Sequence, residues 1–260
     1  TLVMEEFLRR YPAAVVVDQS PVGVNVRSNP ATYTGILDEI RKLFAKANKV
    51  SASLFSFNSQ GACPDCQGLG YIYTELAFME PVRSLCENCQ GHRFNGQVLS
   101  YLYQGKNISQ VLDMTVRQAL DFFPAGKIRE KLTMLSQVGL DYLTLGQPLP
   151  SLSGGECQRL KLAGFLHQQG SIYVLDEPTT GLHPADVDRL MKILEQLVET
   201  GNTVIVIEHN LDVIKQADYV IDLGPGGGNR GGKLLYAGPP AGLLDCEASL
   251  TGACLRREKK

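Results

Sequence analysis

Leu-Ser-Gly-Gly-Glu-Cys-Gln-Arg at residues 152–159 and Ile-Tyr-Val-Leu-Asp-Glu-Pro at residues 172–178 are the stretches that decide the fold of this chain. In the first, a Gly-Gly turn precedes a helical pattern, and Ser153 and Glu156 have the spacing of a capping box. This predicts a helix whose N-terminus offers free N–H groups and partial positive charge, which suits a phosphate group. The second stretch is an apolar strand that ends in two carboxylates. Either stretch alone also fits an ordinary glycine turn or an acidic strand end, but their order and spacing indicate a shared purpose.

The two stretches together resemble the signature motif and the Walker B strand of ATP-binding-cassette (ABC) ATPases. In such a site Asp176 is expected to serve the magnesium shell, and Glu177 to polarise the attacking water. A third apolar run, residues 203–207, predicts another buried strand, and Glu208 and His209 follow it. A lone histidine at a strand end is more often structural, but in this order of elements we interpret His209 as the switch that senses the γ-phosphate.

One motif of this ATPase class does not occur: no Gly-x-x-x-x-Gly-Lys-Ser/Thr stretch is found in the sequence. That loop would supply the backbone amides and the lysine that hold the β- and γ-phosphates. Residues 3–8 follow a helical rhythm, as expected directly after such a loop. We therefore expect the sequence to be a fragment that begins just after this Walker A loop, to bind ATP poorly by itself and to be inactive as an ATPase on its own.

Four cysteines form two C-x2-C pairs that are separated by 19 residues: Cys63, Cys66, Cys86 and Cys89. This spacing is typical of a closed tetrahedral zinc site, and four thiolates leave no open position for catalysis. Gly68 and Gly91 each follow a pair by two residues, which lets the backbone turn toward the thiolates. The sequence predicts a structural zinc that stabilises a hairpin within residues 67–85, with an iron–sulfur cluster or an accidental grouping as the alternatives.

Composition sets further limits on the function. The chain has 260 residues, 44% of them hydrophobic, so it can bury a sizeable α/β core with inserts. Its net charge of −2 gives no overall basic surface, so any nucleic-acid contact must come from local patches. No window has the ~18 consecutive apolar residues of a membrane span, and no secretory signal opens the chain. Paired cysteines among the seven favour a metal site in the reducing cytoplasm over a disulfide framework.

Strand-like and helix-like runs alternate from residue 151 onward, which predicts a parallel sheet flanked by helices. Strands are expected at residues 14–18, 171–175, 203–207, 218–223 and 233–237. Helices are expected at residues 34–46, 115–123, 128–138, 186–199 and 210–217. We divide the chain into an N-terminal part of the ABC core, a zinc insert, a helical signature subdomain, a C-terminal part of the core and a solvated tail, at residues 1–57, 58–98, 99–150, 151–245 and 246–260.

Longer strings resemble the UvrA family, the DNA-damage-recognition ATPases of bacterial nucleotide excision repair, and in particular the C-terminal cassette half of its members. A UvrA-like paralog is the alternative within the same resemblance. The strings are both cysteine pairs and residues 18–23, 27–35, 55–58, 105–108, 111–116, 152–163, 175–183 and 207–214.

The resemblance implies a role for several residues. Gln19 matches the Q-loop glutamine, which reaches toward magnesium and the attacking water. The signature closes over ATP held by the opposite cassette, and it matches Ser153, Gly154, Gly155, Glu156 and Gln158. The implied cofactors are ATP, Mg2+ and Zn2+. The implied partners are duplex DNA, a UvrB-type helicase, a second cassette half and a second copy in a homodimer, with no membrane. In the zinc insert Arg83, His92 and Arg93 are candidate DNA-phosphate contacts, and ordinary solvated charge explains them equally well.

Two functional hypotheses follow. The leading one is an ATPase that couples ATP binding and hydrolysis to recognition of damaged duplex DNA. The alternative is a UvrA-like paralog that acts in drug tolerance or as a regulatory or assembly module without lesion recognition, which the near-neutral charge keeps open. A transporter ATPase is a weaker third hypothesis, because a cysteine insert has no role in docking to membrane subunits.

Overall fold

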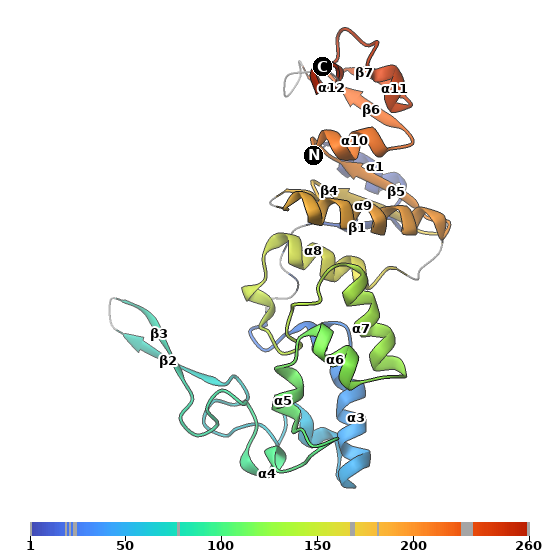
Figure 1. The fold of residues 1–260 in the computed structure, drawn as a ribbon. Coiled ribbons are helices and arrows are strands. Elements are labelled where there is room, and N and C mark those ends of the chain that lie inside the picture. The colour runs from blue at the N-terminus through green and yellow to red at the C-terminus, as the bar shows by residue number, and fades with distance from the viewer. Residues whose placement is uncertain are drawn as a thin grey trace. The chain divides into compact units, whose positions relative to one another are not determined.

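The computed structural model describes residues 2–18, 20, 22, 25–76, 79–166, 170–180, 182–224 and 231–258. The chain forms two compact units (Figure 1). Unit 1 comprises Thr1–Asp18 and Gly170–Lys260, and unit 2 comprises Gln19–Gln169. Unit 1 is therefore assembled from two separate parts of the sequence, and unit 2 is a continuous insertion between them.

Unit 1 contains a three-stranded parallel sheet with the strand order β1-β4-β5. The strands are β1 (Val15–Val17), β4 (Ile172–Asp176) and β5 (Thr203–Ile207). The central strand β4 is the most buried, because it has a neighbour on each side: Val16 pairs with Val174, and Val174 pairs with Ile205. The predicted parallel sheet is confirmed.

Unit 1 also contains helices, two of which correspond to those predicted at residues 186–199 and 210–217. The helices are α1 (Leu2–Arg10), α9 (Pro184–Glu199), α10 (Leu211–Gln216), α11 (Pro240–Leu243) and α12 (Leu250–Glu258). Helix α9 contacts β5 and buries Leu190, Ile193, Leu194 and Leu197, which recur at helical spacing. This stripe is the main apolar cover that α9 gives to the sheet.

Two predictions for the C-terminal part of the chain need correction. The strand predicted at 218–223 is β6 (Val220–Leu223), but within the described residues it pairs antiparallel with β7 (Leu234–Gly238) rather than joining the parallel sheet. The predicted solvated tail includes helix α12, whose Leu255 is 4% exposed. Hydroxyl groups of Ser249 and Thr251 at the start of α12 donate to the carboxylate of Asp222 on β6, which ties the helix to the hairpin.

Unit 2 is mainly helical outside the cysteine module. Its helices are α2 (Pro30–Tyr33), α3 (Ile36–Asn48), η1 (Ala52–Phe55), α4 (Gly96–Leu99), α5 (Ile108–Leu112), α6 (Val116–Phe122), α7 (Lys127–Gln137), η2 (Leu149–Ser151) and α8 (Gly154–Ala163). Asn107 and Thr115 begin α5 and α6 as capping boxes. Phe44 of α3 and Phe55 of η1 are fully buried, with ring centroids 5.3 Å apart. The signature helix α8 belongs to this unit, whereas the sequence division assigned it to the core.

Between the two cysteine pairs lies the antiparallel hairpin of β2 (Tyr71–Leu76) and β3 (Met79–Leu85), as predicted. It extends from the cysteine module in Figure 1. The turn after the first pair requires a glycine at position 68, where φ is +79° and an added Cβ would lie 2.3 Å from the carbonyl oxygen of Phe57.

Candidate functional site

Helix α8 has the capped N-terminus that the sequence predicted. Ser153 is extended (φ −67°, ψ 159°), and its hydroxyl accepts from the backbone N–H of Glu156 at 3.3 Å. In return Glu156 Oε2 accepts from the backbone N–H of Ser153 at 2.8 Å and from its hydroxyl at 3.0 Å. The reciprocal bonds fix the geometry of the first helical turn, where backbone donors can face an anion.

The same glutamate has a partner that sequence reasoning missed. Tyr142 donates its hydroxyl to Glu156 Oε1 at 2.7 Å, and Arg159 Nη2 donates to the Tyr142 hydroxyl at 3.3 Å. Burial opposes ionisation of Glu156, but bonds from Ser153 and Tyr142 outweigh it and hold its pKa below the ordinary value. Burial, and then the bond to Glu156, raise the pKa of Tyr142 to about 12. Tyr142 lies in a connection without periodicity, so no sequence pattern could have found it.

The remaining signature residues differ in accessibility. Gly154 and Gly155 are half-buried, whereas Gln158 is only 2% exposed and lies inside unit 2. Gln19, the predicted Q-loop glutamine, lies outside the described residues.

In unit 1 the carboxyl ends of β4 and β5 meet at one edge of the sheet, because parallel strands end on the same side. Asp176 pairs with Ile207 in register, and the backbone N–H of Glu177 donates to the carbonyl of Ile207 at 2.9 Å. His209 Nε2 lies 3.5 Å from Glu177 Oε1. The structure thus brings together the predicted catalytic residues Glu177 and His209, whose side chains are 50% and 85% exposed.

Glu177 has an unusual backbone conformation. Its φ of +44° lies in the left-handed region, which non-glycine residues rarely adopt. The turn is closed by the N–H of Thr180, which donates to the carbonyl of Glu177 at 3.1 Å, and the Thr180 hydroxyl lies 3.3 Å from Glu177 Oε2. Such conformations persist where surrounding contacts determine them, and they cluster at functional sites.

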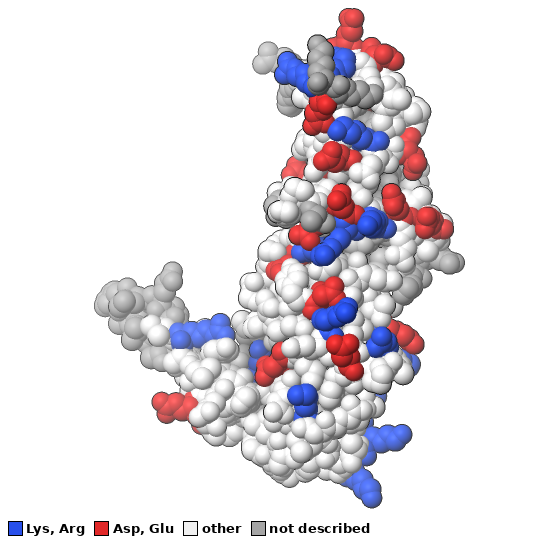
Figure 2. Space-filling view, viewed as in Figure 1, with Lys and Arg blue, Asp and Glu red and all other residues white. Residues whose placement is uncertain are grey.

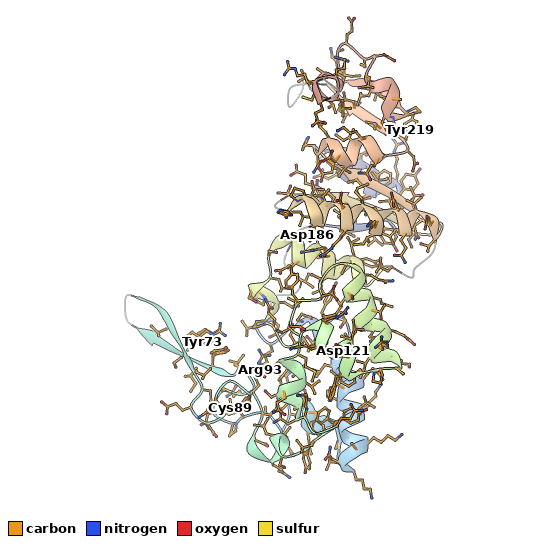
Figure 3. The ribbon with its side chains drawn as sticks, viewed as in Figure 1. Tyr73, Cys89, Arg93, Asp121, Asp186 and Tyr219 are labelled. Atoms are coloured by element: carbon orange, nitrogen blue, oxygen red, sulfur yellow. The ribbon has the colours of Figure 1, made fainter. Side chains whose placement is uncertain are left out.

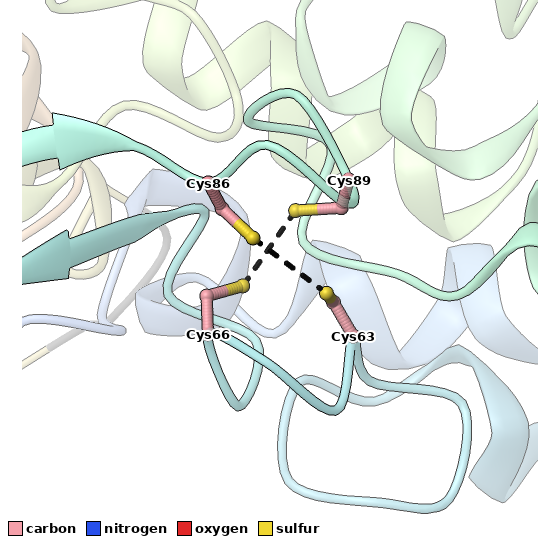
Figure 4. Close-up of side chains that lie close together, drawn as sticks. All are labelled: Cys63, Cys66, Cys86 and Cys89. Carbon is pink, nitrogen blue, oxygen red and sulfur yellow. Dashed lines mark hydrogen bonds between the residues drawn. The ribbon is translucent and has the colours of Figure 1, made fainter.

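The four cysteines of the module converge on one point (Figure 4). All four Sγ atoms lie within 4.8 Å of one another, and each cysteine is at most 5% exposed. Sγ of Cys63 is 3.9 Å from that of Cys86, and Sγ of Cys66 is 3.6 Å from that of Cys89. A tetrahedral zinc with Zn–S bonds of about 2.3 Å requires Sγ–Sγ distances of about 3.8 Å. The donor set therefore fits one zinc ion, and its small span leaves no room for a cluster of several irons.

Electrostatics in the module also favour a cation. Burial raises the pKa of Cys63, and it raises the pKa of Cys89 to about 12. The backbone N–H of Cys89 lowers the pKa of Cys86. The N–H of Gly70 donates to Sγ of Cys66 at 3.2 Å, as amides do around thiolates. Because burial disfavours the thiolates that the geometry brings together, a divalent cation is the natural compensating charge.

The three candidate DNA contacts lie in different surroundings. Arg83 is exposed on the hairpin, with its guanidinium carbon 3.4 Å from the ring centroid of Tyr71. His92 Nδ1 lies 2.9 Å from the hydroxyl of Ser109. Arg93 donates to the carbonyl oxygen of Gly146 at 3.0 Å, and burial lowers its pKa. Figure 3 shows Arg93 near Cys89, at the base of the hairpin that carries Tyr73. These contacts favour a bracing role for Arg93 and leave Arg83 as the accessible cation.

Charge is mixed on the face that Figure 2 shows, where basic and acidic side chains lie side by side over the described surface. No helix within the described residues combines the length and the apolar character that a membrane crossing requires.

Comparisons with known proteins agree with this geometry. A family model described as "ABC transporter" matches residues 75–180. The chain is 52% identical to "UvrABC system protein A" of Streptococcus pyogenes serotype M1 and 51% identical to that of Staphylococcus aureus strain COL, in each case over 92% of this chain and 26% of the relative. The crystal structure of UvrA2 from Deinococcus radiodurans superimposes with a TM-score of 0.88 at 49% identity, over 94% of this chain and 31% of that one. By sequence and by fold the chain is similar to UvrA proteins over nearly its whole length, and it spans about a quarter of the length of the curated relatives.

Proposed function

We propose that this chain is part of a UvrA-like ATPase that couples ATP binding and hydrolysis to recognition of damaged duplex DNA in nucleotide excision repair. The observation that carries the proposal is the 3.5 Å approach of His209 to Glu177 at the carboxyl edge of β4 and β5. The name of the curated relatives, "UvrABC system protein A", supports the repair context.

Each residue has a specific part in this proposal. Glu177 accepts a proton from the attacking water or polarises it, and His209 donates to the γ-phosphate oxygens. Asp176 would hold Mg2+, whose charge neutralises the phosphates when it is bound. For Gln19, which lies outside the described residues, the proposed Q-loop role rests on the resemblance alone. The signature residues serve ATP that is held by another cassette, through the capped N-terminus of α8: Ser153, Gly154, Gly155, Glu156 and Gln158.

ATP binding in this proposal needs a Walker A loop from elsewhere in the longer protein, since none occurs in these 260 residues. The two cassettes of one polypeptide, or of a homodimer, would then supply the complementary halves of each site. A UvrB-type helicase is the proposed partner after damage recognition.

DNA contact is assigned to the zinc hairpin. Zinc at the four cysteines would hold the hairpin in place, and Arg83 is the accessible cation on it. The guanidinium of Arg83 lies over the Tyr71 ring, and such a pair can contact a phosphate with its edge.

A paralog that acts in drug tolerance or as an assembly module is the second candidate. Mixed surface charge favours it, because lesion search on duplex DNA draws on basic patches. The high similarity to UvrA2 as well as to UvrABC proteins is compatible with both functions.

Fluorescence anisotropy on lesion-bearing and undamaged duplexes separates the two candidates. The full-length protein that contains this chain is titrated with and without ATP, alongside its Glu177→Gln variant. If the protein acts in repair, it should bind the lesion-bearing duplex more tightly in the presence of ATP, and the Glu177→Gln variant should form a longer-lived ATP-bound complex. If the protein hydrolyses ATP but binds both duplexes equally, or binds neither, the result would favour the paralog function instead.

A further inference from the structure

A third carboxylate, Glu208, lies at the edge of the sheet that carries Glu177 and His209. Its two oxygens bind two different segments. Glu208 Oε1 accepts from the backbone N–H of Thr179 at 2.8 Å and from the Thr179 hydroxyl. Glu208 Oε2 accepts from the backbone N–H groups of His209 at 2.7 Å and of Asn210 at 3.0 Å. One half-buried side chain therefore joins the loop after β4 to the loop after β5.

Only a carboxylate can make this set of bonds. All four partners are donors, and a carboxylate is an acceptor at both oxygens. An amide of the same shape would present an NH2 group to the donors on one side, so it would release one of the two loops. Burial opposes ionisation of Glu208, but the bonds from Thr179, Asn210 and His209 outweigh it and lower the pKa, so the carboxylate is charged near neutral pH.

A local capping role does not explain these bonds. Helix α10 already has a cap, because Asn210 Oδ1 accepts from the backbone N–H of Asp212 at 2.9 Å. The longer-range bonds of Glu208 reach Thr179, which is 29 positions away and two residues after Glu177. Their effect is therefore on the loop that sets the left-handed turn at Glu177.

We infer that Glu208 is a positioning residue for ATP hydrolysis: its carboxylate bridges the Thr179 loop and the His209 segment and so holds Glu177 and His209 at the observed 3.5 Å. The inference rests on the proposed ATPase function. Glu208 needs no contact with the nucleotide for this role, so it acts on the rate of the chemical step more than on ATP binding.

Steady-state ATPase kinetics of the full-length protein test the inference. Glu208→Gln is expected to lower kcat by about tenfold or more and to leave KM for ATP within about twofold. Glu195→Gln is the matched control, because Glu195 is an exposed glutamate on α9 in the same unit. It is expected to leave both parameters unchanged.

Thr179 supplies a second, milder pair of variants in case Glu208→Gln is poorly folded. Thr179→Val removes the hydroxyl donor and keeps the backbone N–H, so kcat should fall by a smaller factor with KM unchanged. Thr179→Ser keeps the hydroxyl and should retain the parent's kcat. Loss of kcat in Thr179→Ser equal to that in Thr179→Val would overturn the inference, since it would tie the effect to packing of the methyl group.

Glu177→Gln distinguishes a failure of the positioning role from a failure of the proposed ATPase function. If this variant abolishes turnover while Glu208→Gln and Thr179→Val retain the parent's kcat, the positioning role is wrong and the proposed function stands. If the parent has no turnover, or Glu177→Gln matches it, the proposed function itself fails. A fall in kcat together with an equal rise in KM for Glu208→Gln would assign it to nucleotide binding and also contradict the inference.

Discussion

Replacement of Cys89 by serine is the sharpest test of the proposed zinc site. In the structure four thiolate sulfurs lie at the spacing of a tetrahedral zinc, with Sγ–Sγ distances of 3.6 and 3.9 Å. Structural zinc sites bind with an apparent free energy of about 10–16 kcal/mol, so each of four equal ligands contributes about 2.5–4 kcal/mol. Loss of one thiolate is therefore expected to weaken zinc binding by about 100- to 1,000-fold.

The assay is competition for zinc between the reduced protein and a chromophoric chelator, after metal analysis of the purified protein. The parent should contain about one zinc per chain. Cys254→Ser is the matched control, because Cys254 is exposed and lies outside the cluster. It should bind zinc as the parent does. A parent without stoichiometric zinc, or a Cys89→Ser variant that competes as well as the parent, would refute the reasoning from the sulfur geometry.

Three further predictions concern single contacts. Gly68→Ala should lower the free energy of unfolding more than Gly105→Ala does in denaturant unfolding. Both glycines have φ of +79°, but only at Gly68 would the new Cβ meet a backbone oxygen at 2.3 Å. Equal losses of unfolding free energy in the two variants would contradict this prediction. Tyr142→Phe removes the hydrogen bond to Glu156 and should lower the free energy of unfolding by about 1 kcal/mol. The control Tyr219→Phe changes another exposed tyrosine and should leave the free energy of unfolding unchanged. An unchanged denaturation midpoint in Tyr142→Phe would show that the bond contributes nothing to stability. Glu208 has a lowered pKa, so its stabilising effect is full above its unfolded pKa and is lost as pH falls through the folded pKa. The stability gap between the parent and Glu208→Gln should therefore narrow as the pH falls below the ordinary glutamate pKa of 4.5, and a gap independent of pH would argue against a charged carboxylate.

Local patterns were sufficient for most of the fold. Apolar runs at 172–175 and 203–207 form β4 and β5 of the parallel sheet, and the Ser153 and Glu156 spacing gave the start of α8. The expectation that both runs are buried holds for β4 only, because β5 is half-buried, with Thr203 exposed. The pairing of β6 was not predictable in this way. The sequence of a short apolar strand is the same whether its partner is parallel or antiparallel, and β6 pairs with β7, the next strand along the chain.

In the candidate site, too, residues in local motifs were predictable and residues that depend on long-range contacts were not. Motif residues such as Glu177 were found because their chemistry repeats in a known order. Tyr142 and Glu208 were missed as functional candidates, since their importance comes from hydrogen bonds to residues 14 and 29 positions away. Arg93 was selected for its charge alone, and only the structure reveals that its guanidinium is bound to the carbonyl of Gly146.

Unit 1 is built from two separate parts of the sequence, and this has a consequence for synthesis of the chain. Val15 of β1 pairs with Tyr173 of β4, and all of unit 2 is translated between them. At about 5–20 residues per second, a ribosome needs about 8–30 s to deliver β4 after β1. Helices and hairpins form in microseconds, so unit 2 has time to fold while β1 has no sheet to join. A chain whose translation stops within unit 2 can therefore carry a finished cysteine module, but never the edge that holds Glu177 and His209.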